Sequence, residues 1–330
     1  MPDKTDDEQV PDLKGRVSVV MPARNAASTI AEALQSVLVQ AEVREVIVVD
    51  DKSHDRTRAV VESLQDPRVI ILEGEGRGVA RSLNRAIDHA TGQFVARCDS
   101  DDRFAQDRLA WQVAWMDRHT DYVAVSSGFQ TMSKDGRVIA RLACDGAPRD
   151  VTDQLLEGAA VTTLCSFLIR REALLQAGGA RDWFVTSEDL DLMFRLASRG
   201  PVWHNPDVGY YYRLHDSSTV HTQPDVQRRF FEATAVTFAL ERRDGYTDSL
   251  DRGSPPVIPN ALSIITTAGS QIAGQLEGRA WSAFRLGHRR EALGLIIRAL
   301  QNAPTRSSSW RSLILLLARR PRLENVADDM

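Results

Sequence analysis

Acidic side chains are clustered at the end of an apolar run in the first third of the chain. Asp99, Asp101 and Asp102 fall within four residues and directly follow the segment from 94 to 98. Carboxylates this close repel one another unless they are protonated or neutralised, and a divalent cation that bridges them to a phosphate is one reason to keep them together. The alternative interpretation is an acidic turn in contact with solvent. The elements around the cluster decide between the two.

Apolar runs alternate with helical patterns on both sides of this cluster. We predict strands at 17–21, 46–49, 69–72 and 93–98, and helices at 29–38, 57–64 and 79–90. Thr29 and Glu32 have the spacing of a capping box at the start of the first helix. Strands that alternate with helices at this spacing predict a parallel, doubly wound α/β sheet.

That architecture predicts where a ligand would bind. In open α/β sheets, ligands bind beyond the carboxyl ends of the strands, where the segments 22–25, 50–51 and 99–102 should converge. Gly74, Gly76 and Gly78 follow the third strand rather than the first, and their spacing lacks the third glycine of a dinucleotide fingerprint. A Rossmann dehydrogenase is therefore disfavoured.

Composition excludes several classes of protein. The 330 residues carry a net charge of −4, which gives no electrostatic reason to expect nucleic acid as a partner. Three cysteines without metal-ligand spacing suit a reducing cytosol better than a disulfide framework. We expect residues 1–14 to form a disordered tail that is neither signal peptide nor anchor, and no apolar run reaches the length of a membrane span. A cytoplasmic protein is predicted, in solution or peripheral to the inner face of the membrane.

Four segments, in order and spacing, resemble the family 2 inverting glycosyltransferases of the GT-A fold. They are VSVVMPARN at 17–25, EVIVVDDKSHDRT at 45–57, GVARSLNRAI at 78–87 and GQFVARCDSDD at 92–102. The resemblance implies a GT-A domain with a doubly wound mixed sheet, which we place at 15–224. It also implies a nucleotide-diphosphate sugar donor, with a UDP-sugar favoured, a hydroxyl acceptor, and Mg²⁺ or Mn²⁺ held at the DxD motif.

The resemblance also implies roles for single residues. Asp101 is the expected direct metal ligand, and Asp99 is expected to face the ribose or the metal. Asp102 is interpreted instead as an outer carboxylate or as the start of a helix at 106–119. The remaining donor-pocket residues, which would contact the base, ribose or phosphates, are Pro22, Ala23, Arg24, Asn25, Asp51 and Ser100.

A second acidic group, at 188–191, resembles the ED-x-D-L-x-x-R block of the family, in which the aspartate of the ED pair is the catalytic base. That residue is Asp189 here, and Ser187 is a plausible N-cap of the helix that carries it. The alternative is that these carboxylates are only the negative residues favoured in a first helical turn. Trp183 and Phe184, just before this block, are interpreted either as core residues or as a platform for a sugar ring.

The segment 210–218 resembles the YRxHxxS motif, which in related enzymes closes over the donor diphosphate. Arg213 and His215 would share one strand face, and so could point at the same anionic group. The resemblance implies that His215 can be a metal ligand. Arg213 is assigned either to the donor or to a nearby acidic side chain.

Residues 225–330 show only helical patterns, with one stretch at 287–304 that resembles a single tetratricopeptide repeat. The apolar run 313–317 lies between Arg311 and the arginines 319, 320 and 322. It is interpreted as a membrane-surface segment, as a helix packed on the catalytic domain, or as a contact between two copies of the chain.

Two other functions remain open at this point. A sugar nucleotidyltransferase also uses an α/β nucleotide domain with metal carboxylates, but the segment MPARN lacks its glycine-rich basic phosphate loop. A catalytically silent nucleotide-sugar-binding protein would keep the donor residues and lose the base, and Asp189 argues against it.

Overall fold

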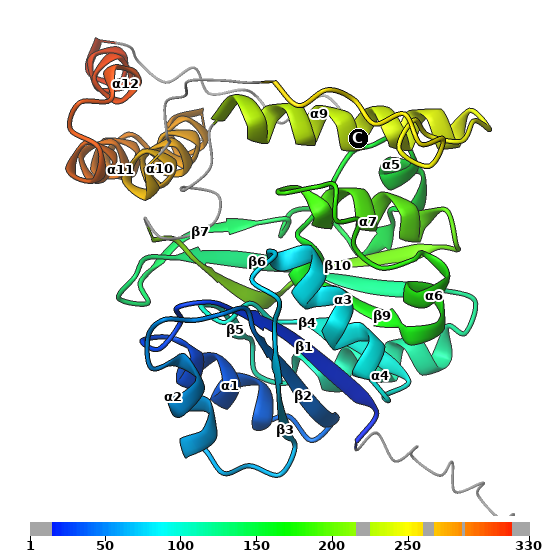
Figure 1. Cartoon of the computed structure of the whole chain (residues 1–330). Helices are drawn as coiled ribbons and strands as arrows, with labels where there is room; N and C mark the ends of the chain where they lie inside the picture. The colour runs from blue at the N-terminus through cyan, green and yellow to red at the C-terminus, as the bar shows by residue number, and fades with distance from the viewer. Residues whose placement is uncertain (1–14, 216–224, 260–266, 286–287, 319–330) are drawn as a thin grey trace, which may run out of the picture.

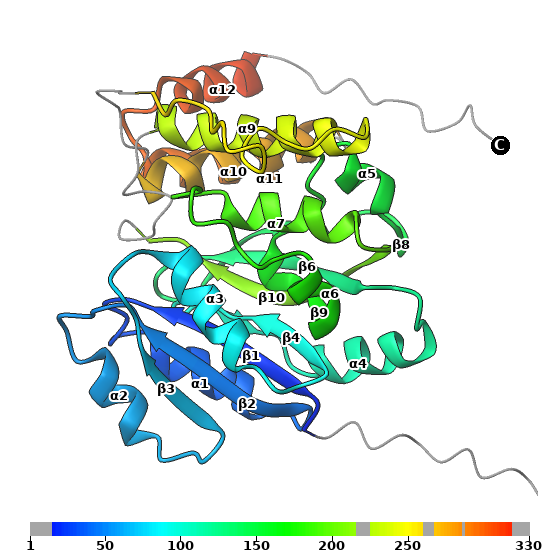
Figure 2. The ribbon, with the colours of Figure 1, turned by 45° about the vertical axis from the view of Figure 1, so that its right-hand side comes forward.

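The computed structural model describes residues 15–215, 225–259, 267–285 and 288–318. The predicted tail at 1–14, the end of the YRxHxxS segment and the arginines 319, 320 and 322 lie outside this part of the chain. Within it, a mixed sheet runs through the centre of the molecule and helices cover both faces (Figures 1 and 2).

The first half of the sheet is parallel. β1 (Val17–Ala23) lies between β2 (Val43–Asp50) and β4 (Phe94–Arg97), and β3 (Val69–Glu73) forms the outer edge. The connecting helices are α1 (Ile30–Leu38), α2 (Thr57–Ser63) and α3 (Val79–His89). This alternation is the predicted one, because buried β-branched runs and amphipathic helices bury each other's apolar sides.

The second half makes the sheet mixed. β9 (Leu168–Arg170) pairs antiparallel with both β4 and β6 (Ala124–Met132), and β6 pairs in parallel with the long strand β10 (Val202–Arg213). The short strands β5 (Arg103–Phe104), β7 (Val138–Leu142) and β8 (Arg149–Asp150) pair antiparallel with β10, β6 and β10 respectively. β6 and β7 form a hairpin whose turn contains Gly136.

Two hydrophobic cores lie on opposite faces of the sheet. One face packs against α1, α2 and α4 (Arg108–Arg118), and the other against α3, α5 (Thr152–Leu156), α6 (Arg171–Gln176) and α7 (Glu188–Ala197). The helix α9 (Asp225–Arg243) adds Phe231 and Phe238 to the second core. The domain boundary that the sequence predicts at residue 225 stays a prediction, yet α9 shares a core with α7.

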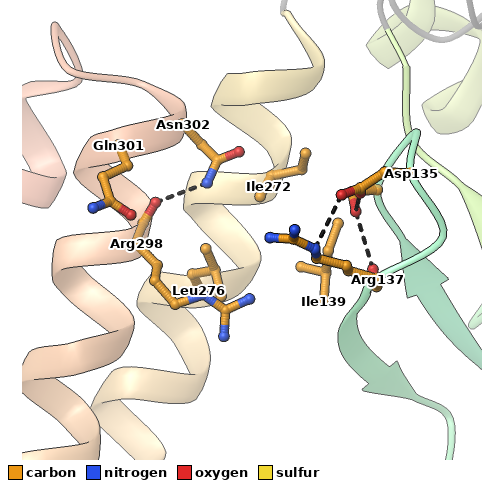
Figure 3. Close-up of a pocket in the computed structure, with 9 residues that line it drawn as sticks. Asp135, Arg137, Ile139, Ile272, Leu276, Arg298, Gln301 and Asn302 are labelled. Carbon is orange, nitrogen blue, oxygen red and sulfur yellow. Dashed lines mark hydrogen bonds and ion pairs between the residues drawn. The ribbon is translucent and has the colours of Figure 1, made fainter.

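The last described part of the chain is a block of three helices, α10 (Ala268–Arg285), α11 (Arg289–Asn302) and α12 (Ser307–Ala318), which we call the C-terminal block (Figure 1). It has a hydrophobic core of its own that also includes Ile139 of β7 and Leu214. A pocket of about 260 Å³ lies between the β6–β7 hairpin and the helices α10 and α11, with Arg137 and Arg298 on its opposite walls (Figure 3). Among the described residues, no helix combines the length and apolarity needed to cross a bilayer.

Several local predictions were wrong. Helix α4 begins at Arg108, and Asp102 does not start it, because the short strand β5 intervenes. Thr29 and Ser187 precede their helices but make no side-chain capping hydrogen bond, so neither acts as the predicted cap. The aromatic pair Trp183 and Phe184 packs against phenylalanines of α9, which confirms the core interpretation.

Candidate active site

The carboxyl ends of β1, β2 and β4 meet at one edge of the sheet. Ala23 pairs with Asp50 across the β1–β2 ladder, and Val20 pairs with Arg97 across the β1–β4 ladder. The predicted donor-pocket segment follows β1 at this edge, where Pro22 is half-buried, Ala23 is buried, and Arg24 and Asn25 are exposed. The structure therefore brings the segments 22–25, 50–51 and 99–102 to one place, as the topology predicted.

Hydrogen bonds hold the loop after β1 against the loop after β2. The backbone N–H of Asn25 donates to the Ser53 hydroxyl at 2.9 Å, and the Asn25 side-chain oxygen accepts from the N–H of His54 at 2.8 Å. The backbone N–H of Ala27 donates to Asp55 at 3.0 Å. Asn25 has a φ of 50°, a left-handed conformation that asparagine tolerates better than most residues. The pocket wall is thus fixed by its own contacts.

Asp51 fixes the glycine-rich loop after β3. Its buried carboxylate accepts the backbone N–H of Gly76 at 2.7 Å on one oxygen and that of Gly78 at 3.0 Å on the other. A side chain at Gly74 would place its Cβ 2.7 Å from the Asp51 Cα, so only glycine fits there. Asp51 therefore shapes the wall of the predicted donor pocket through the backbone it holds.

Arg97 connects the acidic cluster to the helix of the predicted base. Its guanidinium donates to both carboxylate oxygens of Asp99, at 2.6 and 3.2 Å, and to Glu188 of α7 at 3.1 Å. The Arg97 side chain is only 10% exposed, so these ion pairs are poorly screened by water. The two halves of the site, which are 90 residues apart in sequence, are therefore joined through one buried cation.

The two neighbouring carboxyl groups at the start of α7 have raised pKa values. Burial raises the pKa of Glu188 to about 7, although the Arg97 guanidinium opposes this shift. Burial also raises the pKa of Asp189, and Arg97 again opposes it. Glu188 is buried and paired with Arg97, whereas the Asp189 carboxylate is half-buried and accepts the backbone N–H of Leu190 at 2.9 Å. Asp189 is thus the carboxylate of the pair that a ligand can reach.

Asp101 and His215 meet directly. The Nε2 atom of His215 lies 2.7 Å from a carboxylate oxygen of Asp101, and the two side chains are 17% and 28% exposed. Arg213 is buried and donates to the Asp101 carbonyl at 2.8 Å and to Glu32 at 2.6 Å. Of the two interpretations of Arg213, pairing with an acidic neighbour is the one observed.

Asp102 holds the acidic turn on the end of β10. Its buried carboxylate accepts the Tyr210 hydroxyl at 2.7 Å and the backbone N–H of Arg213 at 2.6 Å. Burial, with Asp101 and Asp99 adding repulsion, raises the pKa of Asp102 well above its usual range. Ser100 is buried in the same turn. Asp102 therefore supports the turn that presents Asp101, and its role as an outer carboxylate of a metal site stays a prediction.

The side chains of Asp101 and His215 determine what kind of metal site this part of the protein could form. A carboxylate and an imidazole that already lie together, partly open to solvent, fit a divalent cation that completes its shell with phosphate oxygens and water. Asp99 is engaged by Arg97, and within the described parts of the chain no group of three His, Cys, Asp or Glu side chains is arranged to hold a metal. The residues present fit a metal held jointly with a ligand rather than by the protein alone.

The sequence analysis did not place Arg97, Glu32 or Tyr210 in the candidate site. A signal for Arg97 existed, since alternation along β4 places it with Val95 on the face that packs against α7, where an arginine requires an acidic partner. Glu32 was interpreted as part of a capping box, but it pairs with Arg103 and Arg213 instead. Tyr210 offered no sequence signal, because its partner Asp102 lies 108 residues away.

Comparison with known proteins identifies the family. The model of the family described as "Glycosyl transferase family 2" matches residues 18–177. The putative glycosyltransferase EpsE of Bacillus subtilis is 30% identical over 211 residues, which cover 61% of this chain and 74% of EpsE. The chain belongs to glycosyltransferase family 2. An Escherichia coli relative, the UDP-Glc:alpha-D-GlcNAc-diphosphoundecaprenol beta-1,3-glucosyltransferase WfgD, is 31% identical over 47% of this chain and 60% of its own length.

Solved structures support the fold of this family 2 glycosyltransferase. Residues 1–349 of S. aureus TarS, in complex with UDP-GlcNAc, superimpose with a TM-score of 0.59 at 18% identity, over 88% of this chain and 82% of that one. The mannosyltransferase PcManGT of Pyrobaculum calidifontis, in complex with GDP-Man and Mn²⁺, gives 0.52 at 22% identity, over 90% and 78%. The predicted α/β class with a helical C-terminal region is confirmed.

The matched range divides the site of this glycosyltransferase. Residues 18–177 include the donor-side segments up to Asp102, whereas Asp189, Arg213 and His215 lie beyond the range. The contacts of Arg97 with Glu188, and of Asp101 with His215, bring these later residues to the donor side. The tertiary contacts thus join candidate residues inside the matched range to candidate residues beyond it.

Proposed function

We propose that this glycosyltransferase moves a sugar from a nucleotide-diphosphate donor to an acceptor hydroxyl with inversion at the anomeric carbon, with Asp189 as the general base. The observation that carries the proposal is the Arg97 bridge, which joins the Asp99–Asp101 turn to the helix of Asp189. The Arg97 side chain thereby links the turn proposed to bind the leaving diphosphate to the helix proposed to bind the attacking hydroxyl.

The donor is proposed to lie across the carboxyl ends of β1, β2 and β4. Pro22, Ala23, Arg24 and Asn25 would line the base pocket, the Asp51-held loop would close one side, and Asp99 and Ser100 would face the ribose and diphosphate. A UDP-sugar is favoured because TarS is described in complex with UDP-GlcNAc and WfgD is named for UDP-Glc. PcManGT is described with GDP-Man, so a GDP-sugar is the alternative to test.

A divalent metal, Mg²⁺ or Mn²⁺, is proposed to be held by Asp101 and His215 together with the donor diphosphate. When bound there, it would offset the negative charge of the leaving nucleoside diphosphate. Asp102 and Arg213 keep the turn in place, because the Asp102 carboxylate binds the backbone of Arg213 while the Arg213 side chain binds the Asp101 carbonyl. Asp99 is paired with Arg97 and would touch the metal only if that pair opens.

The reaction is a single displacement. The acceptor oxygen attacks the anomeric carbon, its proton passes to an Asp189 carboxylate oxygen, and the bond from that carbon to the diphosphate breaks with its electron pair leaving on the nucleotide. The raised pKa of Asp189 makes it a better proton acceptor than an exposed aspartate. Glu188, held by Arg97, would orient this turn without taking part in proton transfer. The acceptor is proposed to be a sugar hydroxyl of a glycan or lipid-linked saccharide, in line with the relatives' names.

Asp101→Ala tests the donor half of the proposal. We expect isothermal titration of UDP with Mn²⁺ or Mg²⁺ to give metal-dependent binding for the natural chain and none for the variant. Asp145→Ala removes an exposed carboxylate and should bind as the natural chain does. Binding that is equally tight with Asp101→Ala, or unaffected by EDTA in the natural chain, would refute the metal assignment.

A donor panel tests the substrate. UDP- and GDP-sugars are compared by thermal shift with each metal, and the best donor is then assayed for nucleotide release with saccharide acceptors. Nuclear magnetic resonance of the product reports whether the anomeric configuration has inverted. A product that retains the donor configuration would refute Asp189 as the base of a single displacement.

A further inference from the structure

Helix α12 is turned so that polar residues face the protein and apolar residues face outward. Ser309 and Ser312 are 0% and 8% exposed, whereas Trp310, Ile314 and Leu317 are 49%, 64% and 57% exposed. The exposed three stand at positions i, i+4 and i+7, so they form one stripe along the helix. We call these three residues the α12 stripe.

The buried side of α12 is fully engaged with α10. The Ser308 and Ser309 hydroxyls donate to Glu277, and the indole N–H of Trp281 donates to the Ser312 hydroxyl at 3.1 Å. Leu316, one helical turn beyond Ser312, is 0% exposed and belongs to the core of the C-terminal block. The orientation of α12 is therefore fixed by specific hydrogen bonds. The stripe faces away from the core as a consequence.

The C-terminal block is strongly basic in an acidic chain. Residues 268–318 contain seven arginines, two glutamates and no lysine or aspartate, a net charge of +5, whereas the whole chain carries −4. Arg311 lies next to the stripe in sequence and is exposed. A charge asymmetry of this kind indicates an anionic partner.

We propose that the α12 stripe inserts into the boundary between headgroups and acyl chains of an anionic lipid bilayer, with Arg311 beside the stripe at the lipid phosphates and the net positive charge of the C-terminal block attracting the anionic surface. An apolar stripe with a tryptophan, carried on a cationic helical surface, has the composition of helices that lie in the membrane interface. This surface is separate from the candidate active site, and the inference does not depend on the proposed function.

A bilayer fits this surface better than a second copy of the chain does. In a symmetric dimer the same patch meets itself, which would bring two blocks of charge +5 together. Three side chains also bury only a few hundred Å², well under the roughly 1,200 Å² of a stable protein interface. A fluid bilayer needs no matching shape and supplies the negative charge.

Sedimentation with lipid vesicles tests the proposal on the full chain. We expect binding to vesicles that contain phosphatidylglycerol and much weaker binding to pure phosphatidylcholine, with the difference falling as salt is raised. The triple variant Trp310→Ser, Ile314→Ser, Leu317→Ser should lose about tenfold or more of its partition into the anionic vesicles, because each residue contributes apolar area.

Controls separate this effect from general loss of structure. Val39→Ser and Val257→Ser remove apolar side chains that are 73% and 88% exposed outside the C-terminal block, and they should leave vesicle binding unchanged. Circular dichroism should show the same thermal midpoint for the triple variant and the natural chain, since the stripe makes no core. Arg311→Glu should weaken binding to anionic vesicles only.

Three results would overturn the proposal. They are failure of the natural chain to bind anionic vesicles, equal binding by the triple variant, and a dimer in light scattering that the triple variant converts to a monomer. The last result would assign the stripe to contact between two copies of the chain.

Discussion

Helices α7 and α12 both depart from the usual distribution of side chains, in opposite senses. Helix α7 buries charged residues, with Glu188, Asp191 and Arg195 all less than a tenth exposed, while α12 exposes apolar ones. Every buried charge on α7 has a partner inside the protein, such as Arg97 for Glu188 and Arg181 for Asp191. The stripe on α12 faces outward instead. The buried charges of α7 hold that helix in place within the protein, whereas the exposed stripe of α12 indicates contact with something outside the chain.

The largest expected effect is at the base on α7. Asp189→Asn keeps the shape of the side chain but removes its ability to take a proton, so turnover should fall by about 10²–10⁴-fold. Metal-dependent nucleotide binding should persist in calorimetry. Asp182→Asn, an exposed carboxylate nearby that pairs with Arg81, is the matched control and should keep its activity. Turnover near the natural rate with Asp189→Asn would remove this residue from the mechanism.

Asp191 tests whether the buried charges of α7 hold the helix in place. Its carboxylate is 0% exposed and binds Arg181 and Arg195, and Arg181 also binds Asp248 beyond α9. Asp191→Asn removes the anion that the buried Arg195 shares with the half-buried Arg181, which should lower the free energy of unfolding by about 3–5 kcal/mol. Urea denaturation measures this. A loss below about 1 kcal/mol would show that the network does not fix α7.

The variant Arg97→Gln tests whether Arg97 changes the pKa of the proposed base, Asp189, through its charge. Because Arg97 lowers the pKa of Asp189 against the effect of burial, Arg97→Gln should raise that pKa further. The proposed base acts only when ionised, so activity should be lost as pH falls through the pKa of Asp189, and the acidic limb of the pH profile of kcat should move to higher pH. Arg81→Gln, on α3, should leave the limb in place. An unmoved limb with reduced kcat would limit Arg97 to a structural role.

The smallest effect is expected on the buried side of α12. Ser312→Ala removes the acceptor of the Trp281 indole N–H, which should cost about 1 kcal/mol in unfolding free energy. Ser307→Ala, at the exposed start of the helix, should change stability less. The contrary result is that Ser312→Ala leaves the free energy of unfolding unchanged while the triple variant of the α12 stripe lowers it. The stripe would then be part of a hydrophobic core, and the contrast between α12 and α7 would be wrong.

Much of the donor half was predictable because its signals are local. Apolar runs, glycine positions and the DxDD cluster predicted the parallel strands and the edge at which their ends converge. The outer role of Asp102 was also among the predictions, although its partners were not. The sheet register then placed Ala23 beside Asp50 without any long-range information beyond the order of the strands.

The contacts between distant segments were not predictable in the same way. Glu32 has the spacing of a capping box, but its pairing with Arg103 and Arg213 depends on where β5 and β10 lie. The residues 309 and 312 look like surface serines in the sequence, yet α10 buries them. A periodicity gives the faces of a helix but does not say which face meets the protein.

The sequence by itself determined the α/β class, the acidic turn at 99–102 and the second acidic group at 188–191, because each rests on residues close together in the chain. Only the tertiary structure decided that Arg97 joins these two groups, that Asp101 meets His215, and that α12 turns its apolar stripe outward. Those outcomes depend on how separate elements pack. A buried charge or polar group takes whichever partner the packing brings within hydrogen-bonding distance.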